Sequence, residues 1–168
     1  MKAKVIAAFV AVAMIGGAVA GVLALFGADD EPRPEALTAE EVGILAMHTL
    51  QRATAEQMRH FVSEGVFFDD PARLAPVAEE GGLFLVSTLE VCERRTVAVL
   101  GTDTPDGRTF AVRVQGLEPP EDGEAEIGHF TSVPACEAAG GPGSWPGGYR
   151  ITREGLMKGD AVVDTAVS

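Results

Sequence analysis

One long uncharged run is the first feature in the pattern of hydrophobic and polar positions. Residues 5–26 are 22 consecutive positions without a charged or strongly polar side chain. As an α-helix with a rise of about 1.5 Å per residue, this run would be about 33 Å long, enough to cross a hydrocarbon core of about 30 Å. A helix also satisfies its own backbone hydrogen bonds, which lipid cannot do. The pattern therefore predicts a transmembrane helix that attaches the protein to a membrane.

The charges beside this run indicate its orientation. Lys2 and Lys4 precede it, and three acidic residues follow it at positions 29–31. Because positive flanking charges stay on the cytoplasmic side, we expect residues 1–28 to form a signal-anchor in the cell membrane, with the amino terminus inside and the rest of the chain outside. The alternative is a cleaved signal peptide, since an Ala-Val-Ala sequence ends at Ala20 and cleavage there would produce a secreted protein.

Small residues recur at every fourth position within the predicted span. Ala13, Gly17 and Gly21 lie on one face of such a helix and would let a second helix approach closely, so they are candidate residues for helix pairing in the membrane. A span rich in glycine and alanine also produces this spacing by chance, and that alternative stays open.

Residues 29–37 form a linker, because two prolines in this segment are incompatible with a continuous helix. After the linker, apolar residues recur with the period of an α-helix. Thr38 and Glu41 have the spacing of a capping box, which predicts that a helix begins at Thr38, and Gly65 predicts where it ends. The apolar residues on one face are Val42, Leu45, Ala46, Leu50, Ala53, Met58, Phe61 and Val62. We expect this face to be packed and the opposite face to be exposed.

Two pairs of side chains on and after this helix could suggest a metal site. His48 and His60 are twelve residues apart, so they lie on helix faces about 120° apart and more than three turns distant. We expect both to be solvated and neither to bind a metal ion. Asp69 and Asp70 are better explained by a turn before Pro71, in which one of them caps a short helix.

Further segments have the composition of β-strands. Residues 83–93, 96–101 and 108–115 are rich in apolar or alternating positions, and the turn at 105–107 would join the last two as a hairpin. We expect one face of this sheet to pack on the helix and the other to be solvated. Residues 149–153 repeat the alternation and predict an additional strand.

The segment between these strands is rich in glycine and proline and contains one of the two cysteines. From position 118 to 148, 12 of 31 residues are Gly or Pro, so this region needs an external tie to be ordered. Cys136 lies within it and Cys92 lies on the first predicted strand. In an exported domain the two would most simply form a disulfide, worth about 3–4.7 kcal/mol, and two free thiols are the alternative.

The predicted fold class is therefore α+β. A transmembrane helix precedes a long amphipathic helix packed on a small antiparallel sheet, and the carboxyl-terminal region is rich in glycine and proline and held by the disulfide. The extracytoplasmic domain would span residues 38–154, and a tail would follow at 155–168.

Composition and charge narrow the function further. The net charge is −12 and the first 28 residues carry +2, so the remaining 140 carry −14, which excludes a basic nucleic-acid-binding protein. No motif of a nucleophilic, metal-dependent or nucleotide-binding enzyme is present, and we expect no catalytic residue, cofactor or metal ion. Trp145 and Tyr149 bracket a Pro-Gly-Gly turn and are a candidate interaction surface, or else fold back to fill the edge of a small core.

The order of these elements resembles a type IV pilin or pseudopilin. Residues 57–74 are similar to the end of a pilin helix and its aromatic turn, and the resemblance in layout extends over residues 36–151. It implies a subunit of a surface filament or secretion assembly. A prepilin-peptidase site before the apolar run and a glutamate within it are both lacking, so the resemblance concerns the headpiece.

We therefore expect a single-pass membrane protein with a non-enzymatic extracytoplasmic domain that has a structural or protein-interaction role. Its partner would be another protein or a second copy of the chain. The alternatives are the pilin-like subunit and a secreted enzyme of unknown type.

Overall fold

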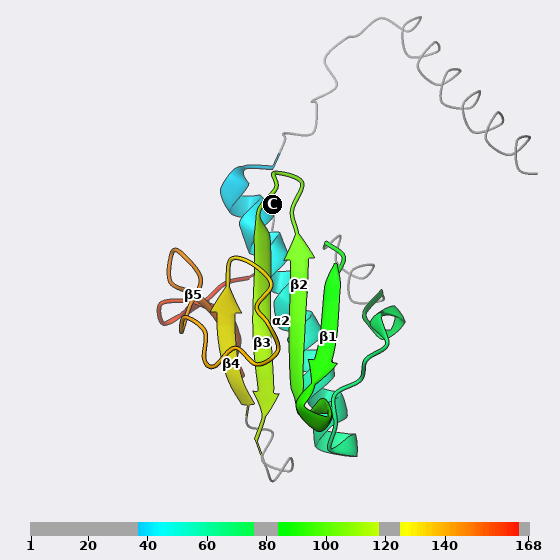
Figure 1. Ribbon diagram of the computed structural model, residues 1–168. Coiled ribbons are helices and arrows are strands. Elements are labelled where there is room, and N and C mark those ends of the chain that lie inside the picture. The colour runs from blue at the N-terminus through cyan, green and yellow to red at the C-terminus, as the bar shows by residue number, and fades with distance from the viewer. Residues whose placement is uncertain (1–36, 76–83, 118–124, 165–168) are drawn as a thin grey trace, which may run out of the picture. The chain divides into compact units, whose positions relative to one another are not determined.

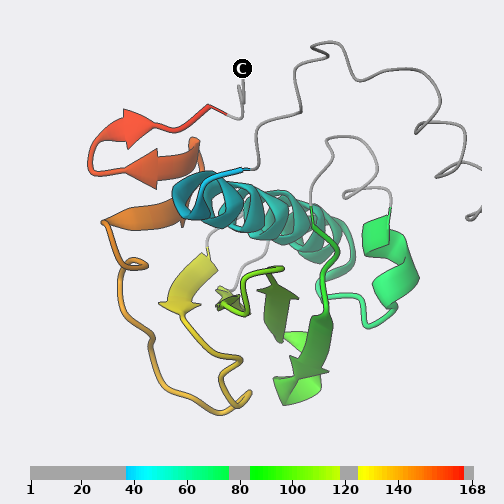
Figure 2. The same cartoon turned by 90° about the horizontal axis from the view of Figure 1, so that it is seen from above.

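A computed structural model describes residues 37–75, 84–117 and 125–164, which belong to one compact unit. A long helix, α2, lies between a four-stranded antiparallel sheet and a smaller three-stranded sheet (Figures 1 and 2). The predicted α+β class is confirmed for this unit. No helix in the described ranges is long and apolar enough to cross a membrane. The predicted span at residues 5–26, with Ala13, Gly17 and Gly21, lies outside those ranges.

Helix α2 (Ala39–Glu64) begins and ends where the sequence predicts. Thr38 is the N-cap and forms both hydrogen bonds of the capping box with Glu41. Gly65 ends the helix in a left-handed conformation, with φ of 73°, and its amide donates to the Phe61 carbonyl at 2.8 Å. These caps satisfy backbone groups that a helix end otherwise leaves without partners.

A short 3₁₀ helix follows the turn after α2, as predicted. It spans Pro71–Leu74, and the Asp70 carboxylate caps it by accepting a hydrogen bond from the Ala72 amide at 3.0 Å. The adjacent aspartates are thus part of a turn and a cap. The Leu74 side chain is buried, which fixes the short helix against the core.

The larger sheet is an antiparallel meander in which neighbours in sequence are neighbours in space. Its strands are β1 (Thr88–Cys92), β2 (Val97–Asp103), β3 (Thr109–Gly116) and β4 (Ala125–Phe130). The first three correspond to predicted strands. Strand β1 is shorter than the predicted segment 83–93, because only the second half of that segment pairs with β2. Strand β4 was not predicted, because its short alternation lies within the glycine- and proline-rich segment.

The smaller sheet is built from β5 (Tyr149–Thr152), β6 (Gly155–Lys158) and β7 (Ala161–Val162). The expectation of a tail from residue 155 onward is therefore wrong for β6 and β7. Their apolar residues are few, but Leu156 and Met157 are buried, and Leu156 belongs to the same core cluster as the apolar residues of α2. Glycines with positive φ at positions 155 and 159 make the tight turns that such short strands need.

The main core lies between α2 and the larger sheet. Apolar side chains of β2 and β3 alternate toward the helix, as expected, and the residues of this cluster include Leu50, Ala53, Phe61, Ala98, Leu100, Phe110, Val112 and Val114. The helix and the end of β3 are in tight contact at Gly116, where an added Cβ would lie 2.3 Å from Cζ of Phe61. Only glycine therefore lets the helix approach the end of β3 in this way.

The second face of the larger sheet is covered, which corrects the expectation of a solvated face. Val97 and Val99 of β2 are fully buried there, together with Cys136. The covering segment, residues 131–143, crosses this face and is visible in yellow to orange in front of β3 and β4 in Figure 1. Alternation along β3 indicated the two faces correctly, but it did not reveal that a distant loop covers the second one.

The expectation of two solvated histidines on α2 is wrong for His48, which is only 5% exposed. The helix packs on the larger sheet and also on β6, so its exposed face is narrower than the sequence indicates. Burial and then Arg52 lower the pKa of His48, while Gln51 and Asp164 act in the opposite direction. His60 is partly exposed and packs its ring edge-on against Phe68, with centroids 5.5 Å apart.

Candidate functional site

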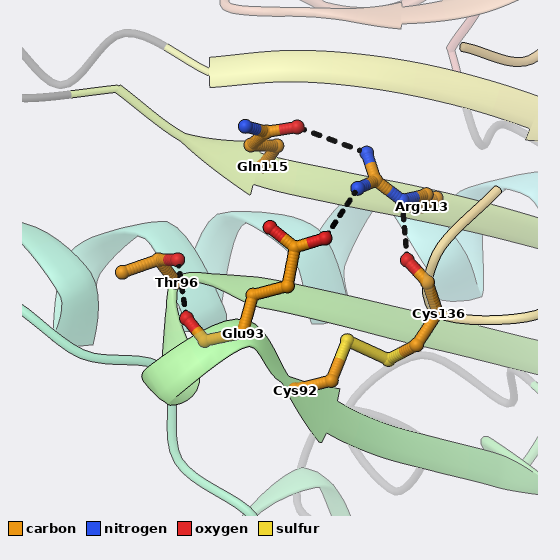
Figure 3. Close-up of a disulfide and its surroundings, with 6 residues drawn as sticks. All are labelled: Cys92, Glu93, Thr96, Arg113, Gln115 and Cys136. Atoms are coloured by element: carbon orange, nitrogen blue, oxygen red, sulfur yellow. Dashed lines mark hydrogen bonds and ion pairs between the residues drawn. A yellow bond between two sulfur atoms is a disulfide. The ribbon is translucent and has the colours of Figure 1, made fainter. Parts of the chain in front are cut away.

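The disulfide ties the end of β1 to the covering segment. Cys92 and Cys136 are bonded, as predicted, with Cα atoms 6.3 Å apart and a sequence separation of 44. Figure 3 shows Arg113 beside this bond, on the covered face of β3. Its Nε donates to the Cys136 carbonyl at 2.9 Å, and its other nitrogens reach Gln115 at 3.1 Å and the Glu93 carboxylate at 3.6 Å. Arg113 is therefore buried and supports the covering segment, on the sheet face that we expected to be solvated.

The turn that follows Cys92 has an unusual backbone. Glu93, Arg94 and Arg95 have φ values of 48°, 57° and 70°, all in the left-handed region that non-glycine residues rarely adopt. Two connections to the segment after α2 hold this turn in place. The Arg95 side chain donates to the Phe67 carbonyl at 3.0 Å, and the Phe67 amide donates to the Arg95 carbonyl at 2.7 Å.

Trp145 and Tyr149 do not form the exposed pair that an interaction surface would require. Trp145 is 1% exposed, and its indole nitrogen donates to the Phe130 carbonyl at 2.9 Å. Its ring packs edge-on against His129, with centroids 4.6 Å apart. Trp145 therefore fills the core, in agreement with the alternative interpretation of the sequence. The Tyr149 ring is also buried, at 6% exposure.

The Tyr149 hydroxyl nevertheless reaches a cleft, which we call the Arg108 cleft. It has a volume of about 590 Å³ and is lined by Glu40, Met47, Arg108, Phe110, Tyr149 and Lys158, among others. Its charged groups are already paired. Tyr149 and Lys158 both donate to the Glu40 carboxylate, at 3.1 and 3.2 Å, and Arg108 pairs with Asp106 at 2.6 Å. A partner in this cleft would therefore contact the aromatic side chains of Phe110 and Tyr149, beside charged groups that are already paired.

A second cleft, which we call the β4–β5 cleft, lies between α2 and those two strands. Its volume is about 340 Å³, and its lining includes Thr54, Met58, Ile127, His129, Ile151 and Arg153. His129 joins the two sheets here, because its Nε2 accepts a hydrogen bond from the Ile151 amide at 2.8 Å. Thr54 Oγ1 and His129 Nδ1, on two residues beside the cleft, are buried away from it and have no hydrogen-bond partner of acceptable geometry within the described residues.

The electrostatic state of His129 follows from its burial. The side chain is 2% exposed, and burial lowers its pKa to about 4, while the nearby Pro142 carbonyl acts in the opposite direction. The ring is therefore neutral at pH 7. His129 lies on β4, within the glycine- and proline-rich segment for which we predicted no strand. The alternation of Ala125, Ile127 and His129 was the signal that would have placed it on a strand face.

The described residues contain no grouping that suggests metal chemistry. Within residues 37–75, 84–117 and 125–164, no three His, Cys, Asp or Glu side chains lie together as metal ligands would. Comparisons with protein families, curated proteins and solved structures found no match to this chain. The function therefore has to be argued from the two clefts, the disulfide and the sequence.

Proposed function

We propose that this protein is a single-pass membrane protein whose extracytoplasmic domain has a non-enzymatic structural or protein-interaction role. The observation that carries the proposal is the Cys92–Cys136 disulfide, because such bonds persist in oxidising compartments outside the cytoplasm. The uncharged run at residues 5–26, with lysines before it and acidic residues after it, supplies the anchor and the orientation.

The Arg108 cleft supports a protein partner or a second copy of the chain. Phe110 and Tyr149 line it, and aromatic pockets with a polar rim are the features on which binding energy concentrates in protein interfaces. Arg108 and Lys158 are paired with acidic side chains, so the cleft has no excess of positive charge that would favour nucleic acid.

Two measurements on the full-length protein test this proposal. Added protease should degrade the domain on intact cells while a cytoplasmic control protein survives. The intact mass after alkylation, with and without prior reduction, should show two blocked cysteines that become reactive only on reduction. The intact mass also shows whether the chain retains residues 1–20 or has been cleaved after Ala20. A protected domain, or two thiols that react without reduction, would contradict the extracytoplasmic role.

The alternative proposal is a pilin-like subunit of a surface filament or secretion assembly. The observation that favours it is the packing of α2 along an antiparallel sheet whose first strand is tied by a disulfide to the region after the sheet. This alternative predicts recovery of the protein in high-molecular-weight fibres after shearing. Monomer or dimer in the membrane fraction alone would contradict it.

A further inference from the structure

We propose that the Arg108 cleft binds an apolar amino acid as a zwitterion, with its carboxylate on Arg108, its ammonium group on Glu40 and its side chain on the apolar floor of the cleft. This inference goes beyond the proposed structural or interaction role, because it assigns a small ligand to the cleft, and it does not depend on attachment to a membrane. A protein partner that used the same aromatic side chains would compete with this ligand.

The cleft lies at the end of the unit where α2 begins. Its lining comes from Glu40, Gly43 and Met47 of α2, from residues 107–110 of the hairpin between β2 and β3, and from Tyr149 at the start of β5. In Figure 1 the start of α2 and the connection between β2 and β3 lie at the same end of the unit. At about 590 Å³ the cleft is within the size range of small-molecule sites.

Arg108 supplies the donor for a carboxylate, although part of its guanidinium group is already bound. Nε and Nη2 donate to the Asp106 carboxylate at 2.9 and 2.6 Å, and Nη2 also donates to the Ala39 carbonyl. These contacts fix the plane of the group and leave Nη1, with two N–H groups, without a hydrogen-bond partner among the described residues. Nη1 lies against Gly43, where an added Cβ would be 3.2 Å from it. The Arg108 side chain lines the cleft and is 42% exposed, so it is open to a ligand.

Glu40 supplies an acceptor of the opposite charge. Its Oε1 accepts hydrogen bonds from Tyr149 and Lys158, and its Oε2 has no partner among the described residues. The Glu40 side chain is 67% exposed. Lys158 and then Tyr149 lower the pKa of Glu40, so its carboxylate is ionised at pH 7. Oε2 can therefore accept a charge-assisted hydrogen bond from an ammonium group.

The charges around these two atoms favour a ligand that carries both signs. Arg108 and Lys158 carry two positive charges, and their partners Asp106 and Glu40 carry two negative charges, so the four side chains sum to zero. A ligand with only a negative charge would be attracted by Arg108 but repelled by Glu40, and a ligand with only a positive charge would meet the reverse. A zwitterion supplies a partner to both free atoms and keeps the balance of charge.

Apolar side chains define the third contact. Met47, Phe110 and Tyr149 line the cleft and belong to the main core cluster. Each is only 5–6% exposed, so core packing fixes this floor before a ligand binds, and little ordering cost remains. The floor favours a hydrocarbon side chain on the ligand over a polar one.

Trp145 makes the proposal measurable. It is the only tryptophan, it precedes Pro146 in the lining of the cleft, and its ring packs edge-on against Phe110 with centroids 6.1 Å apart. Titration of the full-length protein in lipid nanodiscs at pH 7 with L-leucine should give a saturable change in tryptophan fluorescence. We expect a Kd of about 0.1–1 mM, the affinity of a ligand of this size.

Two analogues of leucine test the two charged contacts separately on the wild type. Leucinamide lacks the carboxylate, and 4-methylpentanoate lacks the ammonium group. Each loses one charge-assisted hydrogen bond and should bind at least about tenfold more weakly than leucine.

Glu40→Gln tests the ammonium contact from the side of the protein. Glutamine keeps an oxygen for Tyr149 and Lys158 but removes the charge, so leucine should bind about tenfold more weakly. Binding of 4-methylpentanoate, which has no ammonium group, should not weaken. Glu56→Gln is the matched control, because Glu56 pairs with Arg59 on the same helix outside the cleft, and this variant should bind leucine as the wild type does.

Near-ultraviolet circular dichroism shows whether each variant is folded, and the protease and mass measurements test the extracytoplasmic role independently of this assay. If Glu40→Gln did not fold, the three ligands on the wild type would still decide. The proposal is overturned if leucine gives no saturable response, or if either analogue binds as tightly as leucine. It is also overturned if folded Glu40→Gln binds leucine as tightly as the wild type.

Discussion

At the scale of single residues, the turn after Cys92 combines an unfavourable backbone with a side chain that can be changed. Arg94 has a φ of 57° and is exposed, and its side chain forms no hydrogen bond or ion pair among the described residues. Glycine adopts this conformation without the steric cost that a Cβ brings. Arg94→Gly should therefore raise the free energy of unfolding by about 1 kcal/mol.

Chemical denaturation of the full-length protein measures this effect. Arg94→Ala is the control, because alanine removes the same side chain but retains the Cβ, and it should leave stability within about 0.5 kcal/mol of the wild type. If both variants were stabilised equally, the gain would come from the loss of the arginine side chain and not from the backbone.

His129 makes stability depend on pH. Its pKa is about 4 in the folded protein, against an ordinary value of 6.5, so the unfolded chain takes up the proton first as the pH falls. The contribution of this histidine is fully present above pH 6.5 and is lost progressively as the pH falls to about 4. The expected loss is about 3 kcal/mol, since each unit of pKa difference corresponds to about 1.4 kcal/mol.

The matched variant for this prediction is His129→Gln. A glutamine oxygen can accept the hydrogen bond from the Ile151 amide but does not titrate. The variant is less stable than the wild type at pH 7, because it loses the ring packing with Trp145, but its stability should fall less between pH 6.5 and 4. His48 and the carboxylates contribute equally to both proteins. Parallel stability curves would contradict the assignment.

Residue-scale features were predictable from sequence only where their cause is local. The caps formed by Thr38, Gly65 and Asp70 depend on neighbours within a few positions. Thr38 and Gly65 are where we predicted them, and Asp70 is one of the two candidates for the third cap. The burial of Arg113 depends on the covering segment, which is far away in sequence, and His48 is buried on a helix that packs on both sheets. A histidine or arginine at a polar position of a helix or strand gives no local sign that a distant element covers it.

At the scale of elements, the contact between α2 and β3 depends on Gly116. A Cβ at this position would overlap the ring of Phe61, which is 1% exposed and packs against Phe67 with ring centroids 4.7 Å apart. Gly116→Ala should lower the free energy of unfolding by about 2–3 kcal/mol, as overpacking of a core does. Urea denaturation followed by far-ultraviolet circular dichroism measures the change.

Gly143→Ala is the control for this substitution. Gly143 is exposed, an added Cβ would meet no atom within 4 Å, and its φ is not in the left-handed region. Its free energy of unfolding should change by less than about 0.5 kcal/mol. Equal losses of stability from the two alanines would show that the loss at Gly116 does not come from the contact with Phe61.

Elements were predictable where one segment contains the whole signal. The hairpin of β2 and β3 has a continuous apolar run and an alternating run on either side of an Asp-Gly turn, and helix α2 has an apolar stripe. Strands β4, β6 and β7 are short and lie beside glycines and prolines that mask their alternation. Their stability comes from pairing with other strands and from the core. As a result, the β4–β5 cleft could not be predicted, because β4, one of the two strands that line it, was not predicted.

At the scale of the whole molecule, the disulfide connects the two sides of the larger sheet. It closes a segment of 44 positions that contains β2, β3, β4 and part of the covering segment. The double variant Cys92→Ser with Cys136→Ser should lower the free energy of unfolding by about 4 kcal/mol on the chain-entropy estimate. The reduced wild type is the control, because it lacks the bond but keeps both cysteine side chains, and its stability should match that of the double variant.

The same comparison tests whether the two sheets and the helix unfold as one unit. Trp145 reports on the junction of β4 with the segment before β5, and far-ultraviolet circular dichroism reports mainly on α2. Because α2 packs on both sheets and His129 joins β4 to β5, we expect the two signals to change at the same denaturant concentration in the wild type and in the double variant. A fluorescence transition that came before the loss of helix in the double variant would instead show that the disulfide holds a separately unfolding region against the sheet.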